Sequence, residues 1–159
     1  MWILSQEQRD LTNDFLSRAN RKLEEAKNHL EKHAFPESIS TSQECLELSI
    51  KALFLSFSKA YPSKHPHEKE FENAFIDLIR NIPSDLKYEN FPRMLFLCQL
   101  WSHLCTKAKY GYKKAKVGPT KLFEQLEAQL ALNHANECLT VARRVYIRIC
   151  ESKTIFFKK

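Results

Sequence analysis

Glycine is nearly absent from this chain, which has two glycines in 159 residues, Gly111 and Gly118, close together in the sequence. β-Hairpins rely on glycine in their tight turns, and the loops that hold dinucleotides or triphosphates need several glycines beside a strand. Neither glycine-rich phosphate-binding motif can be written with two glycines at these positions. The sequence therefore excludes those loops and argues against a fold built on sheets.

Apolar residues recur instead at spacings of three and four, which is typical of amphipathic helices. A capping box at Ser5 opens the first of these patterns, whose apolar stripe begins at Leu11. Pro62 and Pro66 forbid a helix between the second pattern and the third. The patterns predict helices over about residues 5–34, 40–61, 71–82, 92–108 and 128–149.

Five helices joined by short connections indicate an all-α fold, an antiparallel up-and-down four-helix bundle with one extra short helix. We expect a single domain over residues 1–159, with its core at about 5–150 and a basic and apolar tail at 151–159. The helix that holds Trp101 is uncharged over residues 94–106, and the tail contains Ile155, Phe156 and Phe157. A homodimer would bury both features, so we expect this chain to pair with a second copy.

The five cysteines form no CxxC pair and lie among apolar residues at helical spacing: Cys45, Cys98, Cys105, Cys138 and Cys150. They predict reduced core thiols in a cytoplasmic protein. The longest uncharged run, residues 94–106, is shorter than the ~20 residues that a membrane-spanning helix needs. The N-terminus also lacks the pattern of a signal peptide, so we expect no contact with a membrane.

The positive charge is concentrated in two segments. Residues 107–123 contain six lysines and no acidic residue, and residues 143–159 contain six basic residues against one acid. Such segments attract phosphate groups, tyrosines offer stacking surfaces, and lysine makes point contacts rather than base-specific forks. A solvated loop and a solubilising tail are the alternative. The candidate binding residues in the first segment are Lys107, Lys109, Tyr110, Tyr112, Lys113 and Lys114.

The histidines give weaker signals. His65 and His67 lie in a loop and suit a metal site or a general base, but no complete ligand set is nearby, which favours a solvated loop. His29 and His33 are spaced to share a helix face that is otherwise polar, so a wet surface is favoured over a metal clip. The other two, His103 and His134, have apolar neighbours and are expected in the core.

Glu47 and Lys51 are four residues apart on the second predicted helix, among apolar neighbours. We expect a partly buried ion pair that fixes the helix register. No paired carboxylates and no serine or cysteine triad stand out. The sequence therefore predicts no catalytic residue, no metal site and no cofactor.

Several segments together resemble the HEPN domain of archaeal and bacterial proteins: residues 42–53, Tyr61-Pro62, His65, residues 108–111, Gly118-Pro119, Leu122-Phe123 and residues 127–142. The resemblance covers about residues 5–150 and implies a helical bundle that is commonly a homodimer. Family members are metal-independent ribonucleases, nucleotide- or RNA-binding modules, or partners of small nucleotidyltransferases in toxin–antitoxin pairs. The resemblance further implies a shared polar site at one end of the bundle, formed by Glu47, Lys51, His65, Lys109 and Tyr110.

The nuclease branch of that family carries an arginine followed by a histidine after four to six residues. No arginine of this chain has a histidine at that distance, since Arg21 and Arg93 come nearest and are too far from His29 and His103. The resemblance thus implies a non-catalytic homodimeric module that binds nucleotide or RNA and pairs with a nucleotidyltransferase. A protein-interaction subunit without a nucleic-acid ligand and a divergent metal-independent ribonuclease are the alternatives.

Overall fold

The computed structural model describes residues 4–151 of the chain. Its helices are α1 (Gln6–Glu31), α2 (Phe35–Ser56), α3 (Lys69–Arg80), α4 (Phe91–Tyr110) and α5 (Gln125–Glu151), with short 3-10 helices η1 (Ser84–Leu86), η2 (Lys113–Ala115) and η3 (Pro119–Lys121). No β-strand forms within residues 4–151, where one isolated bridge pairs Tyr112 with Val117. The predicted all-α fold is confirmed.

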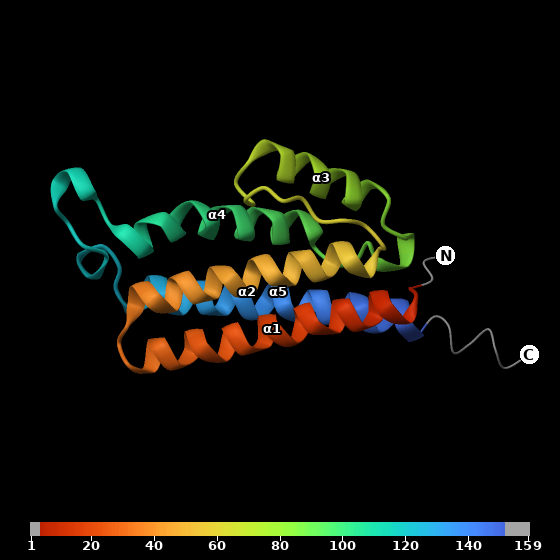
Figure 1. Cartoon of the computed structure of the whole chain (residues 1–159), viewed down its shortest axis with the longest axis horizontal. Helices are drawn as coiled ribbons and strands as arrows, with labels where there is room; N and C mark the ends of the chain where they lie inside the picture. Colours follow the sequence, from red (N-terminus) through yellow and green to blue (C-terminus); the bar gives the residue numbers. More distant parts are fainter. Residues whose placement is uncertain (1–3, 152–159) are drawn as a thin grey trace, which may run out of the picture.

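The four long helices lie side by side, and α1 and α4 run opposite to α2 and α5 (Figure 1). The short helix α3 lies against α4, and the segment between α4 and α5 projects from one end of the bundle. Ala128, Ala131 and Ala135 on α5 are fully buried, because small side chains let neighbouring helices approach closely. The expected bundle with one extra short helix is therefore what the chain forms.

The boundary between the first two helices differs from the prediction. The Ser5 capping box forms as expected, with the Ser5 hydroxyl accepting from the Gln8 N–H at 3.2 Å. However, α1 ends at Glu31, and His33 follows with a left-handed φ of 57°. Helix α2 begins at Phe35, earlier than the predicted residue 40, because a proline in the first turn of a helix costs no hydrogen bond.

Helix α2 also ends earlier than predicted, at Ser56 rather than Tyr61. Ser58 has a left-handed φ of 52°, which turns the chain out of the helix before the prolines are reached. The segment from Phe57 to Glu68 then leads to α3 and passes over α4 (Figure 1). This path carries His65 and His67 to the side of the bundle.

Two expectations about apolar side chains were wrong. Leu11 lies at the edge of the α1 stripe and is 46% exposed. Trp101 is 2% exposed within one chain, and its indole N–H donates to Nδ1 of His134 at 3.0 Å, so burying it requires no second copy. The apolar tail at residues 155–157 lies outside the described residues.

All five cysteines are free thiols, and every one except the half-buried Cys150 is buried. Burial raises the pKa of Cys45 to about 12, and it raises the pKa of Cys98 and of Cys138 well above the ordinary range. These three thiols therefore stay protonated and are poor nucleophiles. In the described part of the chain, no helix combines the length and apolar character needed to cross a membrane.

Two arginine–carboxylate forks tie α5 to its neighbours. Arg144 on α5 donates to both oxygens of Glu89 at 2.7 and 2.9 Å, and the Glu89 side chain is 5% exposed. Arg93 on α4 donates to both oxygens of Glu137 at 2.6 and 3.1 Å, but here both side chains are about 40% exposed. The two forks thus have similar geometry in different surroundings.

Candidate functional site

A hollow of about 370 Å³ lies between α2, α4 and the segment that precedes α3. It brings together four of the predicted binding residues: Glu47, His65, Lys109 and Tyr110. Its lining is completed by Gln43, Glu44, His67, Ser102, Cys105 and Thr106. We call this space the histidine hollow.

The residues of the histidine hollow follow helical periodicity. Glu44 and Glu47 lie three residues apart and share one face of α2, and Ser102, Cys105 and Lys109 share one face of α4. These two faces meet because α2 and α4 pack against each other; the two helices run in opposite directions (Figure 1). The hollow therefore lies along the seam between the two helices.

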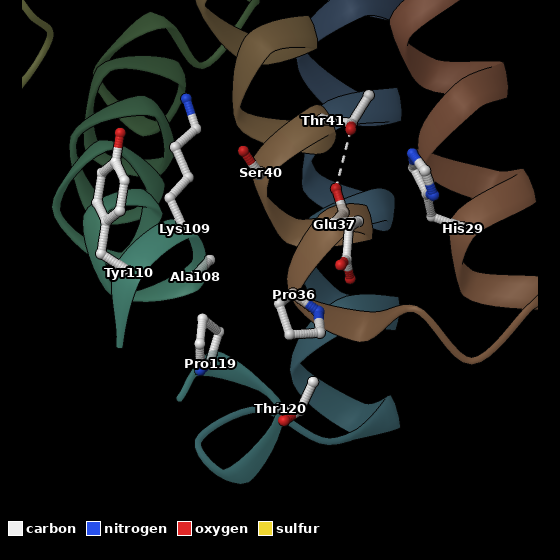
Figure 2. Close-up of a pocket in the computed structure, with 10 residues that line it drawn as sticks. All are labelled: His29, Pro36, Glu37, Ser40, Thr41, Ala108, Lys109, Tyr110, Pro119 and Thr120. Carbon is white, nitrogen blue, oxygen red and sulfur yellow. Dashed lines mark hydrogen bonds between the residues drawn. The ribbon is translucent and has the colours of Figure 1, made fainter. Parts of the chain in front are cut away.

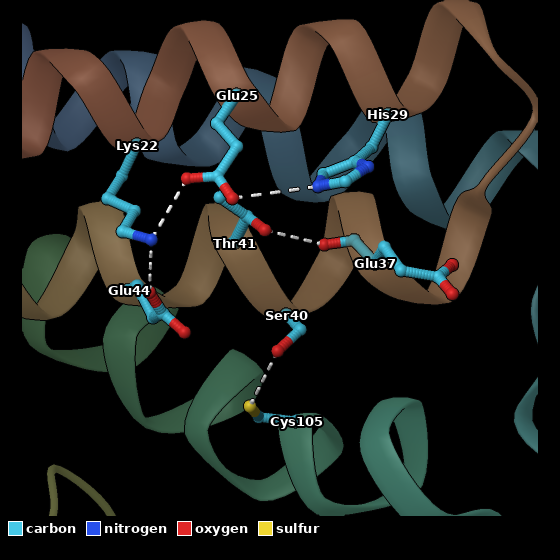
Figure 3. A network of polar contacts seen from close by, with 8 residues as sticks. All are labelled: Lys22, Glu25, His29, Glu37, Ser40, Thr41, Glu44 and Cys105. Atoms are coloured by element: carbon cyan, nitrogen blue, oxygen red, sulfur yellow. Dashed lines mark hydrogen bonds and ion pairs between the residues drawn. The ribbon is translucent and has the colours of Figure 1, made fainter.

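Both carboxylates of this hollow form ion pairs with lysines that lie outside its lining. Glu47 pairs with Lys51 at 2.8 Å, and Glu44 pairs with Lys22 of α1 at 3.0 Å. Lys22 also pairs with Glu25 at 2.9 Å, so it bridges α1 and α2 (Figure 3). Hydrogen bonds to Glu25 and Glu44 raise the pKa of Lys22, so its ammonium stays charged. The two acids consequently oppose an anionic ligand less than free carboxylates would.

Lys51 does not line the histidine hollow. With Arg18, Arg21 and Lys22 it lines a separate hollow of about 310 Å³ that shares Glu44 and Glu47. Its ammonium also lies 5.2 Å from the centre of the Tyr61 ring, a cation–π contact. The expected Glu47–Lys51 pair is partly buried, at 23% and 22% exposure, and Lys51 fastens the segment before α3 to α2.

Three histidine rings stand in series beside the histidine hollow. The His65 and His67 rings are parallel with centres 5.8 Å apart, and the His103 ring follows 4.9 Å from that of His67. Nδ1 of His67 shares a hydrogen bond of 2.8 Å with the Ser102 hydroxyl. The expectation that His103 is a core residue was wrong, because it lies on the exposed face of α4.

The other predictions about histidines have mixed outcomes. His134 is half-buried and accepts the Trp101 bond, as expected of a histidine near the core. His33 lies beyond the end of α1 and does not share a helix face with His29. Among residues 4–151, no group of three or more histidines, cysteines or acids could hold a metal ion.

A second hollow, of about 440 Å³, continues the seam toward the end of the bundle (Figure 2). It shares Lys109 and Tyr110 with the histidine hollow. Its other lining residues are His29, Pro36, Glu37, Ser40, Thr41, Ala108, Pro119 and Thr120. We call it the hydroxyl hollow, and the two hollows together the trough. Sequence reasoning missed the α2 hydroxyls, although they continue the periodicity of Glu44 and Glu47 toward the N-terminus of α2.

Two of the remaining predicted lysines, Lys113 and Lys114, lie on a separate structure, the lysine hairpin (residues 111–118), and Lys107 lies beside it in the last turn of α4. The N–H of Tyr112 donates to the Val117 oxygen at 2.8 Å, and the N–H of Val117 donates back at 3.2 Å. Gly111 opens the hairpin with a φ of 61°, where a Cβ would collide with the Val117 oxygen. Only glycine fits there without strain, whereas Gly118 has open space around it.

Two lysine ammonium groups make cation–π contacts with tyrosine rings in and beside the hairpin. The ammonium of Lys107 lies 4.1 Å from the centre of the Tyr112 ring, and that of Lys113 lies 5.1 Å from the centre of the Tyr110 ring. Lys113 and Lys114 are exposed in η2. The structure thus divides the predicted lysine site between Lys109 in the trough and the lysines on and beside the hairpin.

Comparison with known proteins agrees with this fold of antiparallel helices. The HEPN domain family model matches residues 12–152, and this chain belongs to that family. The crystal structure of TT1696 from Thermus thermophilus is similar, with a TM-score of 0.64 and 18% identity over 84% of this chain and 97% of that one. At this identity the likeness shows the fold alone. No curated protein matches the sequence.

Proposed function

We propose that this HEPN protein is a non-catalytic module that binds a nucleotide or RNA in the trough. The observation that carries the proposal is the composition of the histidine hollow. His65, His67 and Lys109 face the same space as Tyr110, while Glu44 and Glu47 are paired with cations behind them. Cationic and aromatic groups around one cavity suit a ligand that combines phosphate with a flat heterocycle.

The lysine hairpin supports the same proposal from outside the cavity. The hairpin projects beyond the end of the bundle (Figure 1), and its lysines are exposed, so they raise the concentration of anionic ligands near the trough. In keeping with the family, we place the protein in the cytoplasm as a single-domain homodimer with a nucleotidyltransferase as partner. The free thiols are in keeping with that compartment.

The proposal is tested by calorimetric titration of the protein with AMP and with a short single-stranded RNA at several salt concentrations. Lys109→Glu should weaken binding at least tenfold, because it puts an acid where the phosphate is expected. The matched control is Lys27→Glu, which makes the same charge change on the exposed surface of α1, outside the trough. No binding by the wild type, or equal losses in both variants, would overturn the proposal.

The histidine series favours a second function, a divergent metal-independent ribonuclease. The Ser102 bond orients the His67 ring, and an oriented imidazole is a suitable general base. Cleavage of a fluorogenic RNA that persists in chelator but disappears in His65→Ala or His67→Ala would support it. If the pure protein cleaves no RNA over hours, the ribonuclease is excluded and the proposal of a non-catalytic binding module stands. Recovery of a partner protein without nucleic acid would instead indicate a protein-interaction subunit.

A further inference from the structure

The two hollows of the trough adjoin along the α2–α4 seam. Lys109 and Tyr110 line both of them, and the contact of 3.8 Å between the Ser40 hydroxyl of one hollow and the Cys105 sulfur of the other marks the boundary between them. On α2 the lining runs from Pro36 to Glu47, which spans about 16 Å at 1.5 Å per residue. Each hollow alone has a volume in the range of small-molecule sites.

The two hollows differ in chemistry. The histidine hollow offers His65 and His67, with its carboxylates already paired. The hydroxyl hollow offers the hydroxyls of Ser40 and Thr120 beside two prolines, together with the carboxylate of Glu37, which suits the amino group of a base (Figure 2). The cation between them is Lys109, so an anionic group is best placed at the junction and uncharged groups on either side.

We infer that the trough takes a two-armed ligand, in which two nucleosides are joined through phosphate. The phosphate lies at Lys109, one nucleoside lies in each hollow, and Tyr110 flanks the junction. This inference rests on the proposed function and specifies its ligand class. A dinucleotide step of RNA and a free dinucleotide joined by a pyrophosphate share this chemistry. A mononucleotide fills one hollow and leaves the other empty.

The test compares the affinities of AMP, the RNA dinucleotide ApA and diadenosine diphosphate. Thr120→Met fills only the hydroxyl hollow, and Thr106→Met fills only the histidine hollow; both positions are exposed, so both variants should fold. Methionine occupies the space without adding a charge or a ring that could stack. Thr140→Met, on the exposed face of α5, is the matched control.

At least one two-armed ligand should bind wild type tenfold or more tightly than AMP. Each filling variant should remove the tighter binding of the two-armed ligand, and only one of the two variants should weaken the binding of AMP. The control variant should change neither affinity. Preference for ApA would indicate RNA, and preference for the pyrophosphate ligand a free dinucleotide. Equal affinities for AMP and both two-armed ligands, or loss in one filling variant alone, would overturn the two-armed site while leaving the proposed function intact. Absence of binding by all three ligands would overturn both.

Discussion

The two arginine forks allow the contribution of burial to be separated from that of geometry. Arg144→Met removes the partner of Glu89, whose side chain is 5% exposed, and leaves a carboxylate without its charge-assisted hydrogen bonds. Losing one partner of a fully buried pair costs about 3–5 kcal/mol, because the remaining charge is uncompensated. Arg144 itself is half exposed, so water reaches this pair and the cost is reduced to roughly 2–3 kcal/mol.

Chemical denaturation followed by helical circular dichroism measures this loss. The midpoint should fall while the slope with denaturant stays unchanged, because the variant removes an interaction without altering the surface exposed on unfolding. In thermal unfolding, a loss of this size corresponds to about 5–10 °C for a chain of this length. Measurements at two protein concentrations separate the effect from any change in self-association.

Arg93→Met is the matched control. It removes an arginine from a fork of similar geometry with Glu137, but both side chains of that pair are about 40% exposed. Water solvates Glu137 once its partner is gone, so this variant should lose much less stability than Arg144→Met. If the two variants lose the same amount, or Arg93→Met loses more, burial of Glu89 does not determine the cost.

Two further predictions concern His134 and Gly111. Burial lowers the pKa of His134 below its ordinary value of 6.5, so near that pH the unfolded chain binds a proton that the folded chain does not. The free energy of unfolding should therefore fall as the pH drops from neutral through 6.5. In His134→Gln, the thermal unfolding midpoint should depend less on pH between 7.5 and 5.5 than in the wild type. An undiminished pH dependence in that variant would show that another group is responsible. Gly111→Ala should open the lysine hairpin at a local cost of about 1–3 kcal/mol, seen as faster amide exchange at Tyr112 and Val117, whereas Gly118→Ala should leave both amides protected.

The helices and their buried faces could be predicted from sequence because helical spacing is a local property. The buried face of α5 and the Glu47–Lys51 pair both followed from residues three and four apart. The helix ends were less accurate where single backbone angles at His33 and Ser58 decided them. Such angles depend on how the chain packs after it leaves the helix, which spacing does not encode.

The trough could be predicted only in part, because it is made by two helices that are distant in sequence. Glu47, His65, Lys109 and Tyr110 were named from the family resemblance, and the structure brings them to one hollow. The hydroxyl hollow and the contact of His103 with His67 depend on how α4 and the segment before α3 are placed beside α2. No pattern within one helix contains that information.

The ion pairs between α1 and α2 link the stability of the bundle to the charge of the trough. Lys22 joins the two helices and at the same time engages Glu44, which lines the histidine hollow. Lys51 likewise fastens the segment that carries His65 while it engages Glu47. Replacing either lysine would leave a carboxylate facing the ligand without its counter-charge, so anion affinity would fall although neither ammonium has to touch the ligand. The proposed affinity of the trough for phosphate thus depends partly on cations behind its wall, which the lysine-rich segment does not contain.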